Sequence, residues 1–463
     1  MITGFNFAII IYMSKSGQID MINGGILRKI IIFAIPLIAS GVLQQSFNSV
    51  DVAVVGKYAG HQALAAVGSN GMVISIMINL FVGISVGANV VIANYIGQKN
   101  QAGIRMAIQT VGVVAIVSGI ALLFLGTLLA RPILELMSTP DDVIDLATLY
   151  LRIYFLGMPF MMIFNFGSAI LRSFGDTKSP FYALIVAGVI NIGLNLLLVI
   201  VFGMTVDGVA ISTVASNAVS SVIILYLLMK KDAPYHIDLN KLGISRSELL
   251  KMMQIGIPAG LQGMVFSFAN IFIQSTINTF GSDAVAGSAA ALNYEYYCYF
   301  IINAIGQATV AFISQNYGAG NIERCRRIFK YCMILSLIGC GIPNILIAWQ
   351  HHFFLSIFTN SDVVISYGTI RLEYVLMLQF IASSYEISSA AMRGYGYSMT
   401  PTVLTVFGTC VLRLAWIYFA LPYDRTLEML YSVYPISWVI TGIMVVYAYF
   451  KVLKKVNSKV LRS

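Results

Sequence analysis

The sequence is poor in charged residues. Asp, Glu, Lys and Arg make up 10% of its 463 residues, whereas hydrophobic residues make up 58% and the mean hydropathy is +0.84. Because a soluble domain carries about a quarter charged residues, a single water-soluble core is excluded. Apolar stretches that are long enough to cross a bilayer recur along the whole chain, which indicates an all-α polytopic membrane protein.

Histidine and cysteine are scarce as well. The chain has 4 histidines and 5 cysteines, and no CxxC or HExxH motif gives them the spacing of a metal site. The cysteines lie in or beside apolar segments and are interpreted as small core residues, not as disulfides. No nucleophile–base set typical of an intramembrane enzyme is present in the sequence. We therefore expect no enzymatic activity, no cofactor and no resident metal.

Basic residues outnumber acidic ones, 28 to 19, but this excess does not predict nucleic-acid binding. With the N-terminus in the cytoplasm, most Lys and Arg fall on the cytoplasmic side, as the positive-inside rule requires. We expect a multi-pass membrane protein with both termini in the cytoplasm. Residues 1–20 lack the basic start and the cleavage site of a signal peptide, and translation starts at Met1 or at Met13.

The apolar segments predict 12 transmembrane helices. Several are longer than the roughly 20 residues that a span needs, which indicates tilted or bent helices. The predicted limits are 28–56, 65–96, 104–131, 144–170, 180–203, 208–230, 248–280, 284–317, 325–350, 363–392, 399–422 and 432–455.

The two halves of the chain are related by an internal repeat. SAILRSFGDTKSP at 168–180 matches SAAMRGYGYSMTP at 389–401, and AIP at 34–36 matches GIP at 256–258. The offset, which is the number of residues between matching positions, is larger by one for AIP and GIP than for the longer stretch. Such parallel repeats are typical of transporters with alternating access. The predicted organisation is a cytoplasmic segment 1–27, a six-helix N-lobe 28–230, a cytoplasmic linker 231–247, a six-helix C-lobe 248–455 and a cytoplasmic tail 456–463.

Asp51 is a carboxylate inside the first predicted span. Because a charge is costly in hydrocarbon, an ionisable residue inside a span is a candidate functional site. Gln44 and Asn48 precede Asp51 by 7 and 3 residues, so we expect all three on one helix face. Polar candidates on the fifth and sixth spans are Asn191, Asn195 and Thr213. Together these residues predict a site for proton or cation coupling next to a substrate cavity; the alternative is a set of interhelical packing bonds.

Glu295 and Glu386 are acidic residues inside spans of the second half. Under the offset of the longer repeated stretch, their equivalents are Ile74 and Asn165, so the acids are not duplicated and the two lobes differ in chemistry. Arg413 in the eleventh span is a candidate partner for either acid. Two interpretations stay open for these three residues: a coupling site and substrate cavity, or a buried structural ion pair.

The chain resembles the multidrug and toxic compound extrusion (MATE) family in five stretches, which are FNSVDVAVVGKYAGHQALAAVG, LFVGISVGANVVIANYIGQKN, ILRSFGDTKSP, FISQNYGAGN and AMRGYGYSMTP. They occur in the family's order and span nearly the whole chain. The resemblance implies a V-shaped pair of six-helix lobes in the bacterial cytoplasmic membrane. The family exports organic, mostly cationic and amphipathic compounds in exchange for H⁺ or Na⁺ by alternating access. It also implies small-molecule substrates. We expect contact with membrane lipids and a monomer.

The resemblance also assigns residues. The family's first-span aspartate matches Asp51, and an asparagine and a threonine that act with it in some branches match Asn191 and Thr213. A second aspartate of those branches is replaced here by Asn195. The resemblance thus implies a candidate Na⁺ site at Asp51, Asn191, Asn195 and Thr213, and H⁺ remains the other candidate ion.

The second half matches the family less completely. Glu295 matches an acid of the eighth span in many bacterial relatives, and Glu386 lies where members often carry an acid in the tenth. The alternative function within the same superfamily is a flippase for a lipid or a lipid-linked saccharide. Such a cavity should hold several cations for a pyrophosphate, and the arginines inside predicted spans are few: Arg152, Arg371 and Arg413.

Overall fold

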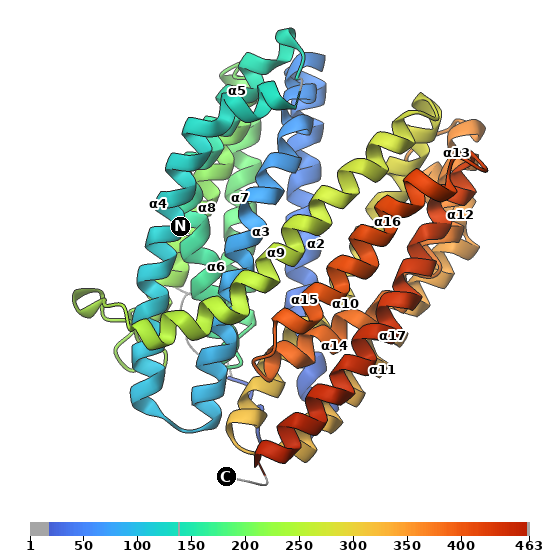
Figure 1. Cartoon of the computed structure of the whole chain (residues 1–463). Coiled ribbons are helices and arrows are strands. Elements are labelled where there is room, and N and C mark those ends of the chain that lie inside the picture. Colours follow the sequence, from blue (N-terminus) through green and yellow to red (C-terminus); the bar gives the residue numbers. More distant parts are fainter. Residues whose placement is uncertain (1–17, 138, 461–463) are drawn as a thin grey trace. The chain divides into compact units, whose positions relative to one another are not determined.

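The computed structural model describes residues 18–137 and 139–460, and these residues form helices and no strand (Figure 1). The first half contains α2 (Ile26–Tyr58), α3 (His61–Gly97), α4 (Gln101–Leu136), α5 (Asp141–Leu156), α6 (Met158–Ser173), α7 (Lys178–Asn195), η1 (Leu196–Val201) and α8 (Val206–Leu228). The choice between Met1 and Met13 and the last residues of the predicted tail lie outside the described residues.

The helices of the second half are interrupted more often than those of the first half. It contains η2 (Leu239–Lys241), α9 (Arg246–Asn278), α10 (Ser282–Gly318), α11 (Ile322–Trp349), α12 (His351–Ser356), α13 (Asp362–Arg371), η3 (Leu372–Leu376), η4 (Gln379–Ala382), α14 (Ser383–Gly394), α15 (Met399–Thr405), η5 (Val406–Val411), α16 (Leu412–Ala415), η6 (Trp416–Ala420) and α17 (Leu427–Val460). The segments η1, η3, η5 and η6 are π-helical, whereas η2 and η4 are 3₁₀-helical.

The chain divides into two compact units at matching positions of the repeat. The first unit includes Ala39–Gly260, and the second includes Met21–Ile38 and the chain from Leu261 onward. The boundary after residue 38 and the boundary after residue 260 are equivalent positions, because the offset between them is the one that relates AIP to GIP. α2 and α9 each contribute one part to each unit.

Both boundaries follow a proline inside a helix. Pro36 lies in α2 and Pro258 lies in α9. Proline removes a backbone N–H and clashes with the preceding turn, so it weakens the helix where it stands. The predicted lobes 28–230 and 248–455 assign each of these helices whole to one lobe, whereas the compact units divide both of them.

The predicted spans correspond to helices of the structure. Within residues 18–137 and 139–460, 11 helices are long and apolar enough to cross a membrane, and α5 with α6 forms a further span that is bent by 48°. The fourth predicted span, 144–170, is therefore two helices that meet at Gly157. Pro159 stands in the first turn of α6, and its missing N–H cannot continue the hydrogen bonds of α5.

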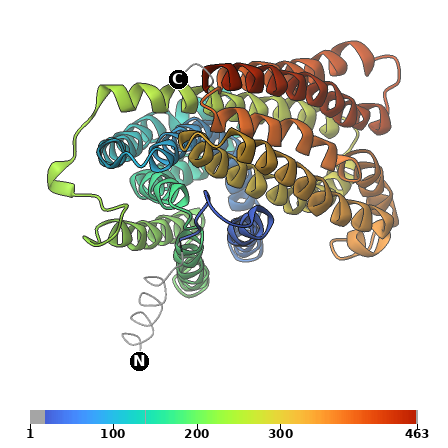
Figure 2. The same cartoon turned by 90° about the horizontal axis from the view of Figure 1, so that it is seen from below.

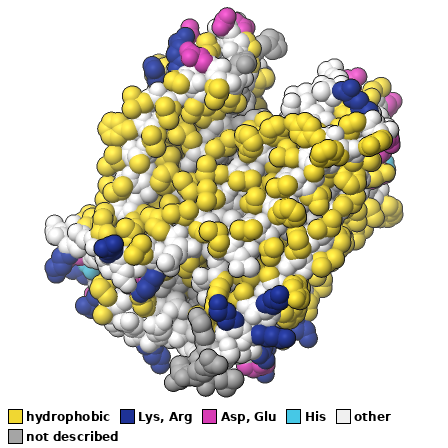
Figure 3. Space-filling model, viewed as in Figure 1, with side chains coloured by type: hydrophobic (Ala, Val, Ile, Leu, Met, Phe, Trp, Pro, Cys, Tyr) yellow, Lys and Arg dark blue, Asp and Glu magenta, His cyan; other side chains and the backbone are white. Residues whose placement is uncertain are grey.

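The surface has the pattern of a protein surrounded by lipid. Figure 3 shows hydrophobic side chains over the middle of the helices and charged side chains toward the helix ends. Large apolar side chains such as Phe124, Leu128 and Phe419 are exposed. Exposed apolar surface of this extent is normal for a membrane span and unusual for a soluble monomer.

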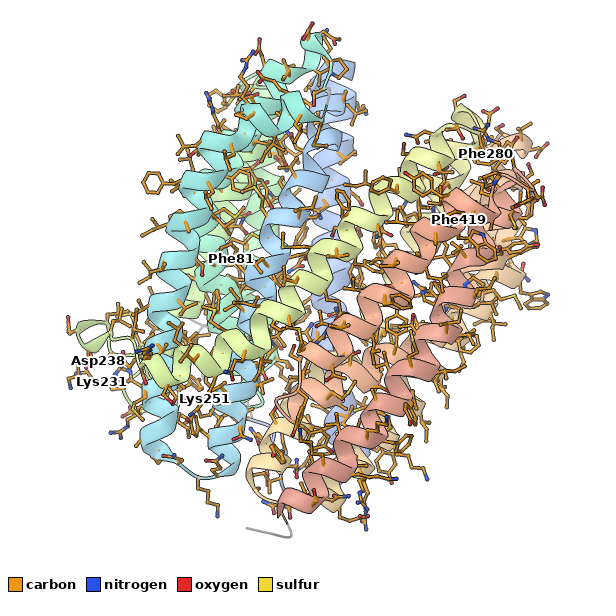
Figure 4. All side chains as sticks on the ribbon, viewed as in Figure 1. Phe81, Lys231, Asp238, Lys251, Phe280 and Phe419 are labelled. Atoms are coloured by element: carbon orange, nitrogen blue, oxygen red, sulfur yellow. The ribbon has the colours of Figure 1, made fainter. Side chains whose placement is uncertain are left out.

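The segment between α8 and α9 lies against α4 in the first unit. Figure 2 shows it as a light green loop, and Figure 4 labels Lys231 and Asp238 on it. Ile237 is 4% exposed, and the backbone N–H of Ser245 donates to Thr110 Oγ1 at 3.1 Å. The segment predicted as a linker is therefore partly anchored to a helix.

α3 and the first part of α9 approach each other at backbone distance within the first unit. A Cβ atom on Gly83 or Gly87 would overlap the backbone of α9 at Gly260 or Met252, and a Cβ atom on Gly256 would overlap the backbone of α3. Each helix has its two glycines four positions apart, the spacing with which small residues bring membrane helices into close contact. This contact holds α9 to the first unit.

We predict that Gly83→Ala lowers the stability of the full-length protein in detergent by about 1–3 kcal/mol, because the added methyl group must displace backbone. Gly68→Ala is the matched control on the same helix, since nothing lies within 4 Å of a Cβ atom there. Thermal unfolding followed by circular dichroism measures both. Equal unfolding midpoints for the two variants would contradict the close contact.

Candidate ion-binding site

Asp51 lies in the part of α2 that belongs to the first unit, and its side chain is 8% exposed. Its Oδ1 accepts a hydrogen bond from Nδ2 of Asn195, and Thr213 places its hydroxyl group beside the same carboxylate. The hydroxyl group of Ser212 donates a hydrogen bond to Oδ1 of Asn195. These residues and Asn191 are called the Asp51 cluster below.

Helix geometry explains how the cluster assembles. Asn191 and Asn195 are one turn apart on α7, with Asn195 Nδ2 at 3.5 Å from Asn191 Oδ1. α7 ends at Asn195, and the π-helical η1 starts at the next residue. A π-helical turn changes the direction in which side chains leave the helix and is frequent at functional sites. α8 packs against α7 and brings its own hydroxyl groups to the same place.

The surroundings of Asp51 are polar but uncharged. Among the described residues, no Lys, Arg or His forms an ion pair with Asp51. Tyr150 and Tyr154 of α5 lie near enough to interact with it electrostatically. An isolated carboxylate in such a place is satisfied by a proton or by a small cation. Amide and hydroxyl oxygens beside a carboxylate are ligands that hard cations accept.

Two candidates from the sequence do not join the cluster. Gln44 and Asn48 are exposed, whereas Asp51 is buried. The spacing along α2 gives only the angle between side chains about the helix axis. Which side chains become buried depends on where α7 and α8 cover that helix, and this was not visible in the sequence. Ser212 was missed, although its position next to Thr213 was a usable signal.

Glu295 of α10 forms an ion pair with Arg371 of α13. Arg371 Nη2 donates to Oε2 of Glu295 at 3.0 Å, its Nε donates to Oε1, and its Nη1 donates to Ser288 Oγ at 2.6 Å. Both partners are buried, at 6% and 3% exposure. Arg413 is therefore not the partner of Glu295, and every nitrogen of the Arg371 side chain has an acceptor.

Glu386 of α14 is also not paired with Arg413 in the described structure. Tyr299 Oη donates to its Oε1 at 3.4 Å, and Arg393 interacts with it electrostatically. Arg413 of α16 is 1% exposed, and its Nε donates to Ser437 Oγ at 3.3 Å. The hypothesis of a Glu386–Arg413 ion pair is wrong because the two side chains have different neighbours.

The MatE family model matches the chain twice, over residues 36–197 and 258–419. The chain belongs to the MATE family. Its members are transporters, so the chain is a transporter and not an enzyme. The two matches begin at positions that are equivalent under the offset of AIP and GIP, which agrees with the repeat found in the sequence.

Relatives and solved structures agree with this assignment. The probable multidrug resistance protein YoeA of Bacillus subtilis is 29% identical over 437 residues, which are 92% of this chain and 94% of YoeA. The probable multidrug resistance protein NorM of Thermotoga maritima is 26% identical over 395 residues, 84% of each chain. A structure described as the outward-facing conformation of a multidrug resistance MATE family transporter aligns with a TM-score of 0.88 at 23% identity, over 96% of this chain and 99% of that one. The predicted fold is thereby confirmed.

We predict that Glu295→Gln lowers stability by about 3–5 kcal/mol, because it leaves the buried guanidinium of Arg371 without its counter-charge. Replacing both partners, as Glu295→Gln with Arg371→Met, should recover most of the loss. The exposed pair of Arg131 and Glu135 is the control, where Glu135→Gln should change stability by about 1 kcal/mol or less. Thermal unfolding of the purified variants measures all three, and a double variant that is as unstable as the single one would contradict a structural pair.

Proposed function

We propose that this MATE transporter is a secondary antiporter. It exports organic, mostly cationic and amphipathic compounds across the bacterial cytoplasmic membrane in exchange for H⁺ or Na⁺, by alternating access. The observation that carries the proposal is the buried Asp51, held by Asn195 and free of ion pairs among the described residues. The names of YoeA and NorM, both probable multidrug resistance proteins, support drug export.

The chemistry of exchange follows from the cost of a buried charge. An empty carboxylate in a low-dielectric site is unfavourable, so Asp51 is most stable when it holds one positive charge. A proton, a sodium ion or the cationic group of a cargo can supply that charge. If the ion and the cargo cannot be bound together, each drives the release of the other, which is the coupling that an antiporter needs.

The coupling ion has two candidates with different requirements. A proton needs only the carboxylate and an entry path. Na⁺ needs several oxygen ligands, for which Asp51, Asn191 and Thr213 are available. We propose a single-ion exchange through Asp51, since Asn195 supplies no second negative charge. Transport under separate pH and Na⁺ gradients decides between the two ions.

Nothing in the site favours a lipid or lipid-linked saccharide flippase. A pyrophosphate needs several free cations, whereas Arg371 is neutralised by Glu295 and, among the described arginines named above, Arg413 alone is buried without an ion pair. We further propose that the chain acts as a monomer. We also propose that both termini lie on the cytoplasmic side, because this orientation places most Lys and Arg in cytoplasmic segments.

Asp51→Asn is predicted to abolish ion-coupled export while the protein still folds, because the amide has the shape of the carboxylate but cannot take up a positive charge. We expect a decrease of at least about 100-fold in the rate of dye-cation efflux from proteoliposomes under an imposed gradient, equivalent to roughly 2.7 kcal/mol or more. The control is Asp283→Asn, since Asp283 is exposed at the start of α10. Wild-type rates in the folded Asp51→Asn protein would refute the proposal.

Ser212→Ala is predicted to weaken ion binding about 2- to 10-fold, the effect of losing one buried hydrogen bond that orients Asn195. Ser220→Ala on the same helix is the control, because Ser220 is buried and bonds only to the carbonyl of Asn217 in its own helix. The apparent affinity for the coupling ion is read from transport rates at several ion concentrations. Identical affinities for the two variants would exclude Ser212 from the site.

A further inference from the structure

Arg413 is a buried guanidinium with unused donors. Its side chain is 1% exposed, and only Nε has an acceptor, Ser437 Oγ at 3.3 Å. Among the described residues, nothing accepts a hydrogen bond from Nη1 or Nη2. Arg371, in the same unit, shows the contrast, because all three of its nitrogens donate to Glu295 or Ser288.

The neighbours of Arg413 do not neutralise it. The guanidinium lies over the ring of Tyr434 at 4.3 Å and near the ring of Phe266 at 5.5 Å from the centroid. Ring faces attract a cation but accept no strong hydrogen bond in the guanidinium plane. Arginine keeps its charge at every physiological pH, so it cannot escape the cost of burial by losing a proton. Two parallel N–H donors of this kind fit the two oxygens of a carboxylate.

Glu295 and Glu386, the two acids of the second unit predicted to lie inside spans, already have partners. Glu295 is bound by Arg371, and Glu386 accepts from Tyr299 and lies beside Arg393. In the described part of the chain, no Asp or Glu forms an ion pair with Arg413. The anion that would balance Arg413 is thus not among these side chains.

The backbone around Arg413 is irregular. Arg413 lies on α16, a segment of 4 residues between the π-helical η5 and η6. π-helical segments are rare and are frequent at functional sites.

The repeat makes Arg413 the counterpart of a residue in the Asp51 cluster. α7 begins at Lys178 and α15 at Met399, which are equivalent under the offset of the longer repeated stretch. The π-helical η5 takes up one extra residue, so beyond it the offset is larger by one and Arg413 corresponds to Asn191. The same larger offset, which also relates AIP to GIP, relates Asp51 to Ile273, an apolar residue of α9 with 2% exposure. At these equivalent positions, the second unit has an apolar residue in place of the carboxylate and a cation in place of the amide.

We propose that the second unit contains a binding site for a compact anion, in which Nη1 and Nη2 of Arg413 donate to a carboxylate and Phe266 and Tyr434 contact the apolar group that bears it. In this proposal, the carboxylate is part of a transported aromatic compound. The alternative source of the negative charge is a free inorganic anion such as chloride, and the test below distinguishes the two. The site goes beyond the proposed exchange at Asp51, because binding at Arg413 needs no coupling ion.

The test uses the full-length chain purified in detergent, with benzoate as the carboxylate, benzamide as its neutral counterpart and chloride as the inorganic anion, all at constant ionic strength. Benzoate should raise the unfolding midpoint in a saturable way, since a ligand that binds only the folded state stabilises it. Benzamide should not. A midpoint raised by chloride, with benzoate competing, would assign the site to a free inorganic anion, and no rise with either anion overturns the site.

Variants locate the effect. Arg413→Met should weaken benzoate binding roughly tenfold or more, the loss expected for charge-assisted hydrogen bonds. Arg425→Met, at an exposed arginine, should keep the wild-type response. If Arg413→Met does not fold, Arg413→Lys takes its place, because it keeps the charge but loses the paired donors and should also bind benzoate more weakly. An unchanged benzoate response in the folded Arg413 variant overturns the proposal.

Asp51→Asn separates this proposal from the function proposed above. That variant should lose ion-coupled export and still respond to benzoate. Loss of the benzoate response in Asp51→Asn would contradict an independent site at Arg413, whereas normal export in Asp51→Asn would contradict the antiport proposal and leave the anion site in place.

Discussion

The structure depends on how the free-energy cost of burying a charge inside membrane-spanning helices is offset. Three arrangements of buried ionisable groups meet this constraint in different ways. Glu295 and Arg371 neutralise each other through two hydrogen bonds. Asp51 accepts a hydrogen bond from a neutral amide and forms no ion pair among the described residues. Arg413 has aromatic neighbours and unused donors. The first arrangement gives stability, and we propose that a ligand balances the charge in the other two.

The helices support these arrangements through local irregularities. Pro36 and Pro258 weaken α2 and α9 at equivalent points of the repeat, where each helix passes from one unit to the other. The π-helical η1 follows Asn195 directly, and η5 and η6 flank Arg413. Each irregularity costs helix stability, and the π-helical segments among them lie next to the Asp51 cluster and to Arg413. An irregular backbone at membrane depth is tolerated only where other groups satisfy it.

Much of this account could be predicted from the sequence, because hydrophobicity and repetition are local signals. Long apolar runs predicted the spans, a nearly constant offset predicted the duplication, and Asp51 was conspicuous as a carboxylate in an apolar run. The pairing of side chains was less predictable. Glu295 and Arg371 are far apart in the sequence, and their contact depends on how α10 and α13 pack. Arg413 was expected beside an acid because a buried charge usually has a counter-charge. This expectation was wrong, because no Asp or Glu among the described residues forms an ion pair with Arg413.

The central claim is that one positive charge on Asp51 is exchanged for the cargo. The most direct test measures ion release when a cationic cargo binds to the purified protein in detergent, by a pH indicator for H⁺ and by radioactive sodium for Na⁺. The account predicts that about one ion is released per cargo bound by the wild-type protein, and none by the Asp51→Asn variant, because only the carboxylate has a charge to exchange. Equal ion release by the two proteins would contradict it.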